Sequence, residues 1–153
     1  MPRLLIFAPC ENVLISQGSS ASLIVILHRI DLSGDIPEPI PENTATQMKW
    51  HIFAQWETEP EETGVKFEQK IEMSSKDGTM VPSIAGIAEF VPEAGKPVHR
   101  MIVNLTFFPI IPAGFYRLRL SLRRSDQQGE WIPHGDYPLE ISYQHRPAAV
   151  HST

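Results

Sequence analysis

Residues 115–124 read FYRLRLSLRR, in which apolar and polar side chains alternate. A period of two residues puts each set on its own face of a β-strand, whereas an amphipathic helix needs a period of about 3.6. We expect a half-buried antiparallel strand. Its two faces divide as follows: Tyr116, Leu118, Leu120 and Leu122 inward, and Arg117, Arg119, Ser121 and Arg123 outward.

The same alternation recurs along the chain and predicts strands over residues 48–57, 65–73 and 137–143. Residues 23–30 and 101–108 differ because they are apolar on both faces. This indicates central strands or strands under a partner surface, and their short length and β-branched content favour strands over helices. Residues 3–8 and 84–91 complete the set of expected strands.

Turn residues and prolines separate these strands. Asp77-Gly78 is a tight-turn signal, and Pro37, Pro39 and Pro41 mark an extended connection. The chain has 14 prolines in 153 residues, which excludes a helical bundle or a coiled coil. The sequence therefore predicts an all-β fold, an antiparallel β-sandwich of seven or eight strands. Residues 1–143 form this single domain, and residues 144–153 form a loosely ordered tail.

Charge and cysteine content narrow the classes of partner and compartment. The net charge is −5, which disfavours general affinity for nucleic acid or anionic membranes. No apolar stretch reaches the 18 or so residues that span a bilayer. Cys10 is the single cysteine, so no internal disulfide can form. We expect a cytoplasmic protein without nucleic-acid or membrane partners.

Two resemblances accompany this pattern. Gly114-Phe115-Tyr116 resembles the entry to a late strand of immunoglobulin-like sandwiches, where the tyrosine hydroxyl bonds to nearby backbone. The order of Cys10-Glu11, Gly18, Asp77-Gly78 and Gly114-x-Tyr116 is similar to that of a family of small bacterial β-sandwich proteins of unknown function. The resemblance covers residues 10–143. It implies an immunoglobulin-like layout without the disulfide, and it implies no activity.

The residues that could carry catalysis or bind a metal do not form a recognisable pattern. The six histidines show no His-x-His or His-x-x-x-His pair: His28, His51, His99, His134, His145 and His151. Cys10 lacks the local signature of a nucleophile, and the chain has no glycine-rich phosphate loop. We therefore expect a non-catalytic protein with no catalytic, cofactor-binding or metal-binding residue. A His-dependent enzyme is the less favoured alternative.

Trp131 lies in a turn-like stretch, Gly129-Glu130-Trp131-Ile132-Pro133, and is expected to be exposed there. An exposed tryptophan suits a carbohydrate-binding sandwich, whereas the parity of Trp50 and Trp56 indicates core positions. Carbohydrate binding through Trp131 is the main alternative to the function preferred below.

The candidate interaction surface is an arginine row formed by Arg117, Arg119 and Arg123. Alternate strand residues lie about 6.6–6.8 Å apart, so these charges repel unless something neutralises them. Cross-strand pairing with Glu68, Glu72 or Glu140 is one account, and an anionic partner surface is the other.

The preferred function is a protein-interaction or structural module that binds a protein partner or self-associates through a strand face. That face is suggested by three apolar residues at nominally outward positions: Phe53, Ile102 and Phe108.

Overall fold

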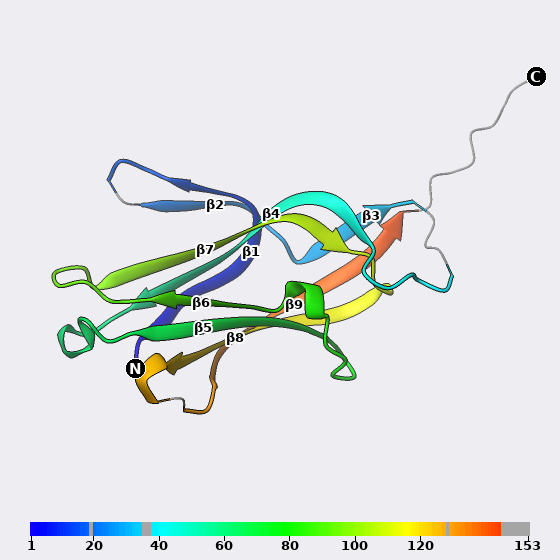
Figure 1. Ribbon diagram of the computed structural model, residues 1–153. Helices are drawn as coiled ribbons and strands as arrows, with labels where there is room; N and C mark the ends of the chain where they lie inside the picture. Colours follow the sequence, from blue (N-terminus) through cyan, green and yellow to red (C-terminus); the bar gives the residue numbers. More distant parts are fainter. Residues whose placement is uncertain (19, 35–37, 128, 145–153) are drawn as a thin grey trace, which may run out of the picture.

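The computed structural model describes residues 1–18, 20–34, 38–127 and 129–144, which form nine strands in two sheets (Figure 1). The first sheet has the order β2-β1-β4-β7, with β2 (Ala21–Ile26), β1 (Arg3–Ile15), β4 (Ala45–Glu57) and β7 (Val98–Pro109). The second sheet has the order β3-β9-β8-β5-β6, with β3 (Arg29–Ser33), β9 (Ile132–Gln144), β8 (Gly114–Arg124), β5 (Phe67–Ser75) and β6 (Gly86–Phe90). Short 3-10 turns occupy Pro60–Glu62, Pro82–Ile84 and Ser125–Gln127.

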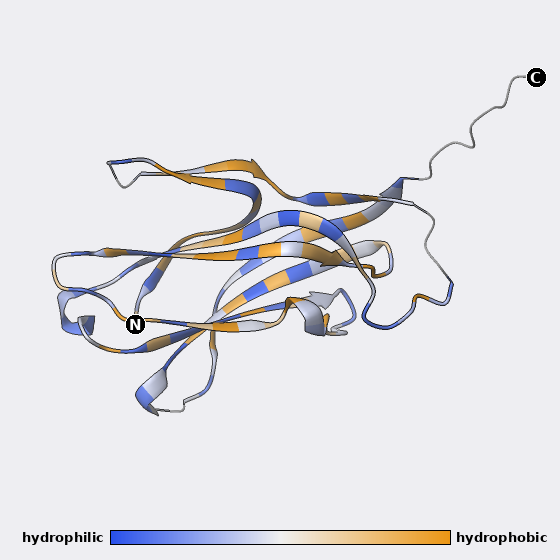
Figure 2. Ribbon diagram, turned by 45° about the horizontal axis from the view of Figure 1, so that its top comes forward, coloured by the Kyte–Doolittle hydropathy of each residue, from blue (hydrophilic) through white to orange (hydrophobic). Residues whose placement is uncertain are grey.

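The all-β prediction is confirmed, and the two sheets enclose one hydrophobic core. The alternating segments lie in β4, β5, β8 and β9, and the bands of hydropathy along the strands are visible in Figure 2. Their inward residues are buried as expected, and they include Trp50, Ile52, Trp56, Phe67, Ile71, Met73, Leu118, Leu120, Leu122, Leu139 and Ile141. The second sheet curls into a half-barrel. Among the described residues, no helix is long and apolar enough to span a membrane.

The apolar run 23–30 is split between two edge strands, so the prediction of a central strand is wrong. The alternative, a strand under a partner surface, stays a prediction. The chain leaves the first sheet after Ile26 and enters the second at Arg29. There β3 pairs with β9 in parallel, with Ile30 opposite Ile141, so the fold is not wholly antiparallel. The two-sided apolar character has a different cause: the run serves two sheets in succession. The split also makes nine strands in the described residues where seven or eight were expected.

The second two-sided segment, 101–108, lies in β7 and is not central either. β7 is one of the two edge strands of the first sheet and pairs only with β4 within that sheet. Met101, Val103, Leu105 and Phe107 pack against the core, whereas Ile102, Asn104 and Thr106 are exposed. The segment therefore alternates like an ordinary half-buried strand.

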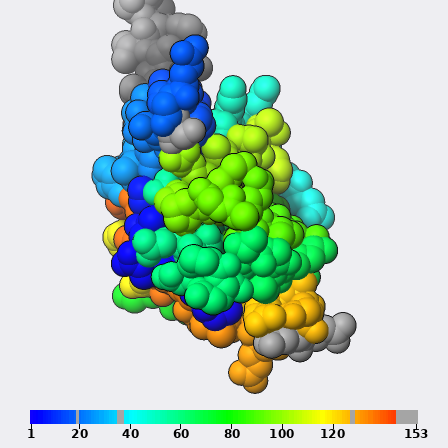
Figure 3. All heavy atoms as spheres, turned by 90° about the vertical axis from the view of Figure 1, so that its left-hand side faces the viewer, coloured from blue at the N-terminus to red at the C-terminus, as the bar shows by residue number. Residues whose placement is uncertain are grey.

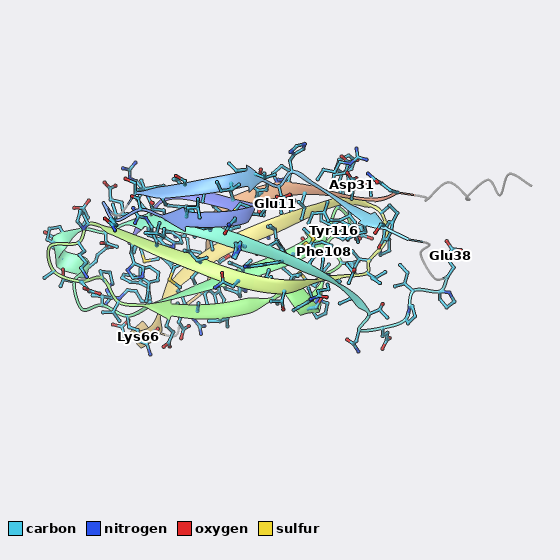
Figure 4. The ribbon with its side chains drawn as sticks, turned by 90° about the horizontal axis from the view of Figure 1, so that it is seen from above. Glu11, Asp31, Glu38, Lys66, Phe108 and Tyr116 are labelled. Carbon is cyan, nitrogen blue, oxygen red and sulfur yellow. The ribbon has the colours of Figure 1, made fainter. Side chains whose placement is uncertain are left out.

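The hydrogen bond expected from the Tyr116 hydroxyl to nearby backbone is confirmed. The Tyr116 hydroxyl donates a 2.8 Å hydrogen bond to the carbonyl of Pro112, four residues upstream in the connection between β7 and β8. Nearby, the Tyr143 hydroxyl donates a 2.7 Å bond to the carbonyl of Ile111. Two tyrosines from the second sheet thus hold this connection. Figure 4 shows Tyr116 and Phe108 at the same end of the molecule, away from Lys66.

We expect Tyr116→Phe to lower the free energy of unfolding by about 1 kcal/mol, because the phenyl ring keeps its packing and only the hydrogen bond is lost. Urea unfolding followed by circular dichroism measures the change. Tyr137→Phe is the matched control, since the Tyr137 hydroxyl has no hydrogen-bond partner among the described residues. Equal losses in both variants would show that the corner hydrogen bond contributes nothing particular.

Candidate functional site

The arginine row of β8 is largely neutralised by neighbouring strands. The Nε atom of Arg123 lies 2.5 Å from an Oε2 oxygen of Glu68, one of the partners expected from the sequence. Arg119 instead meets Asp136 of β9, at 3.3 Å. Each acid lies directly opposite its arginine in the strand register. Cross-strand pairing therefore accounts for two of the three arginines.

Arg117 is the member of the row that has no acidic partner among the described residues. It is exposed, and its cross-strand neighbours are Ser74 and Pro138. An exposed ion pair such as the one made by Arg119 contributes about 0–1 kcal/mol, so an anionic partner could compete for that arginine. The row as an anion-binding surface stays a prediction that depends mainly on Arg117 and Arg119.

Trp131 is half-buried and packs on the outer face of the second sheet. The Lys70 ammonium lies 4.9 Å from the centre of its ring, and the Arg123 guanidinium lies 4.3 Å from it. Both contacts are of the cation–π kind. A sugar that stacked on this ring would have to replace at least one of these cations.

Two histidines pack against the aromatic end of the core. His99 stacks on Phe90 with ring centres 4.6 Å apart, and His134 meets Trp56 edge-on at 5.2 Å. Burial lowers the pKa of both imidazoles below the ordinary value. For His99, the nearby Lys96 lowers the pKa further while Glu93 raises it; for His134 the N-terminal ammonium adds to the lowering.

The remaining candidates for chemistry are scattered. His51 Nδ1 lies 2.6 Å from Asn104 Oδ1, and Cys10 is fully buried, which raises the pKa of its thiol. His145 and His151 lie outside the described residues, as does most of the tail predicted over 144–153; Gln144 still belongs to β9. In the described part of the chain, no three His, Cys, Asp or Glu side chains come together in a way that could hold a metal ion.

We expect the stability of the protein to fall as the pH drops below about 6.5, the ordinary pKa of histidine. The folded state holds His99 and His134 at lower pKa values, so the unfolded state binds more protons in that range and is favoured. The His99→Phe variant keeps a ring on Phe90 and should lose less stability between pH 7 and 5. Urea unfolding at each pH measures this slope, and a slope in His99→Phe equal to that of the wild type would contradict the prediction.

The feature that sequence reasoning missed is a two-stranded arm, residues 12–26, formed by the second half of β1 and by β2. β1 continues seven residues beyond its expected end at Ala8 and pairs with β2 up to Ile15 opposite Ala21. Figure 1 shows β1 bending sharply before it enters the arm, and Figure 3 shows the arm as a blue ridge on the rest of the molecule. Five large apolar side chains of the arm are 40–54% exposed: Leu14, Ile15, Ile24, Val25 and Ile26.

Val25 interrupts the regular geometry of this arm. Its φ angle is +50°, a left-handed conformation that is a genuine outlier for a β-branched residue. The register continues on both sides, with Asn12 opposite Ile24 and Cys10 opposite Ile26. The regular part of the outer strand is therefore 21–24.

The apolar positions that suggested an interaction face are mostly buried. Phe53 and Phe108 are both 0% exposed, so the interpretation of these two residues as a free surface is wrong. Phe108 belongs to the core and packs on Trp50, with ring centres 5.5 Å apart. Phe53 is buried without belonging to the core shared by the two sheets. Ile102 keeps 37% of its surface exposed.

A cleft of about 750 Å³ opens at the end of the sheets where β7 ends and β8 begins. Residues 40–45, 75–77, 79–83, 107 and 109–116 line it, and four prolines are among them: Pro41, Pro82, Pro109 and Pro112. Met80 and Phe115 are 44% and 64% exposed in this lining. The volume lies within the range of about 300–1,000 Å³ that is usual for small-molecule sites. The cleft is a second apolar surface, separate from the arm.

Comparison with known proteins finds no family model that matches the chain and no curated protein of significant similarity.

Proposed function

We propose that this chain is a non-catalytic β-sandwich protein that acts as a protein-interaction or structural module, and that the arm is its contact surface. The observation that carries this proposal is the exposure of large apolar side chains on a ribbon of only two strands. A two-stranded hairpin is marginally stable by itself, so exposed apolar residues on it gain most when another surface covers them.

The energetic gain from such a contact is sufficient for specific binding. Fully burying one Leu, Ile or Val side chain contributes about 1.5–3 kcal/mol. Leu14, Ile15 and Ile24 are each about half-exposed, so covering them recovers a large part of that free energy. The neighbouring polar residues, Asn12 and Ser22, are uncharged. Removing water from this surface on binding therefore costs little free energy.

We also propose an immunoglobulin-like layout and membership of the small bacterial β-sandwich family that the sequence resembles. The hydrogen bond from the Tyr116 hydroxyl to the Pro112 carbonyl supports the layout. The motifs that carry the family resemblance lie in β1, in turns and at the start of β8. Cys10 and Glu11 come directly before the arm, and Gly18 lies in its turn (Figure 4 labels Glu11). Gly78 has a φ of +90° in the turn after β5. A single buried cysteine supports a cytoplasmic location.

The alternatives gain no such support. Carbohydrate binding would use Trp131, which already contacts Lys70 and Arg123. A His-dependent enzyme would need histidines close to one another or to Cys10, whereas His99 and His134 pack on core aromatic rings. Both remain predictions, and stoichiometric metal analysis and glycan binding test them.

We expect Leu14→Lys to reduce binding of the partner at least tenfold, because a charge then replaces an apolar contact on the arm. Affinity capture from the source cells, followed by titration of the captured partner, measures the loss. Ile132→Lys is the matched control: Ile132 is 47% exposed and Leu14 is 52% exposed, but Ile132 lies on β9, in the second sheet. Unchanged binding by the Leu14→Lys variant would contradict the proposal, as would equal losses in both variants.

A further inference from the structure

We propose that the arm binds a second copy of this chain, through antiparallel pairing of β2 with β2 across a two-fold axis. The proposal rests on the proposed function and names its partner. β2 is one of the two edge strands of the first sheet and, among the described residues, pairs only with β1. Its other edge leaves backbone N–H and C=O groups free to pair with another strand.

The other sheet edges carry features that hinder such pairing. β3 carries the Arg29–Asp31 ion pair, while β6 carries Glu89 in an ion pair with Lys66 and is followed by Val91 and Pro92. β7 carries His99 and Arg100, follows Pro97 and ends at Pro109. Charge and proline are usual means of blocking an edge. β2 reads ASLIVI and contains neither a charged residue nor a proline.

The charge of the arm favours a second copy over a foreign chain. In a two-fold contact the same surface is used by both copies, so a surface that carries charge of one sign faces like charge. The chain has a net charge of −5, yet residues 12–26 contain no charged residue at all. The arm can therefore meet its own copy without like-charge repulsion. Each of the other strands in the described residues contains at least one charged residue.

The irregularity at Val25 limits the extent of the pairing. The regular edge, 21–24, gives each copy four residues to pair. An isologous contact uses the same edge on both copies, so the assembly closes at two. The apolar side chains Leu14 and Ile24, which lie on the same face of the arm, then extend the buried surface beside the new strand pair.

The first test is sedimentation velocity over micromolar to submillimolar concentration. The wild-type chain should show a concentration-dependent dimer, and Ile24→Lys should raise the dimer dissociation constant at least tenfold. Ile87→Lys is the matched control: the same substitution, at a 60% exposed position on the edge strand β6, should leave the constant unchanged. Both variants lower the net negative charge equally, so general repulsion cannot explain a difference. Circular dichroism shows that each is folded.

A second measurement locates the contact. In Ser22→Cys, oxidation or a short thiol-reactive linker should give a covalent dimer, because Ser22 lies near the middle of the regular edge. Ser33→Cys, on the edge strand β3, should remain monomeric under the same treatment. Cys10 is fully buried and serves in both variants as an unreactive background. Equal cross-linking of the two variants would overturn the assignment to β2.

The outcomes separate this proposal from the one on which it rests. A wild-type chain that stays monomeric at all concentrations overturns the proposal that the arm binds a second copy. If Leu14→Lys still abolishes capture of a different protein, the proposed function stands without the dimer. If neither self-association nor capture depends on the arm, both proposals fail.

Discussion

The hydrogen bond from the Trp56 indole to the Gln69 side chain joins the two sheets inside the core. Trp56 lies on β4 and Gln69 on β5, and the Nε1–Oε1 distance is 2.8 Å. Both side chains are almost fully buried, at 0% and 1% exposure. A buried polar group without a partner costs about 1–3 kcal/mol, so both groups are satisfied only while the sheets keep this alignment. Phe90 and His134, both from the second sheet, contact the same indole. The alignment of the sheets, and with it the position of the cleft at their end, depends on this cluster.

Local alternation was enough to predict the strands that line this core. Along 115–124 the pattern assigns Tyr116, Leu118 and Leu120 inward, as the structure has them. The prediction from alternation failed where the position of a segment in the sheets, and not its local pattern, decided which of its residues are apolar. Residues 23–30 are apolar on both faces because they contribute first to one sheet and then to the other, a change that occurs at Leu27 and His28. The expectation that prolines separate the strands failed at Pro133, whereas Pro138 lies inside the segment 137–143 that was expected to be a strand. Pro133 and Pro138 stand inside β9, but β3 pairs only from Glu140 onward, so both prolines lie where β9 has a single neighbour.

The candidate surface was harder to predict than the core. Pairing of Arg123 with Glu68 could be expected because both positions followed from alternation, whereas Asp136 required the register between β8 and β9. The exposure of the arm could not be predicted from the sequence, because Leu14 and Ile24 are residue types that usually lie in a core. Whether a strand has a neighbour is decided by long-range pairing. The hairpin itself, as distinct from its exposure, could have been predicted, because two short apolar runs lie on either side of Gly18.

β1 links the core to the arm, and Pro9 lies at the boundary. Leu4 and Phe7 pack against the core, whereas Leu14 and Ile15 are exposed on the arm. The Pro9 carbonyl accepts a 2.9 Å hydrogen bond from the amide of Leu27, the residue just after the end of β2. In an antiparallel pair the N–H and C=O groups of one residue point toward the same neighbouring strand. The N–H group that Pro9 lacks would therefore point toward Leu27, which lies just beyond the end of β2. A proline is therefore tolerated inside this strand. No residue of the arm belongs to the buried core, so a polar substitution on its surface leaves the packing between the two sheets intact.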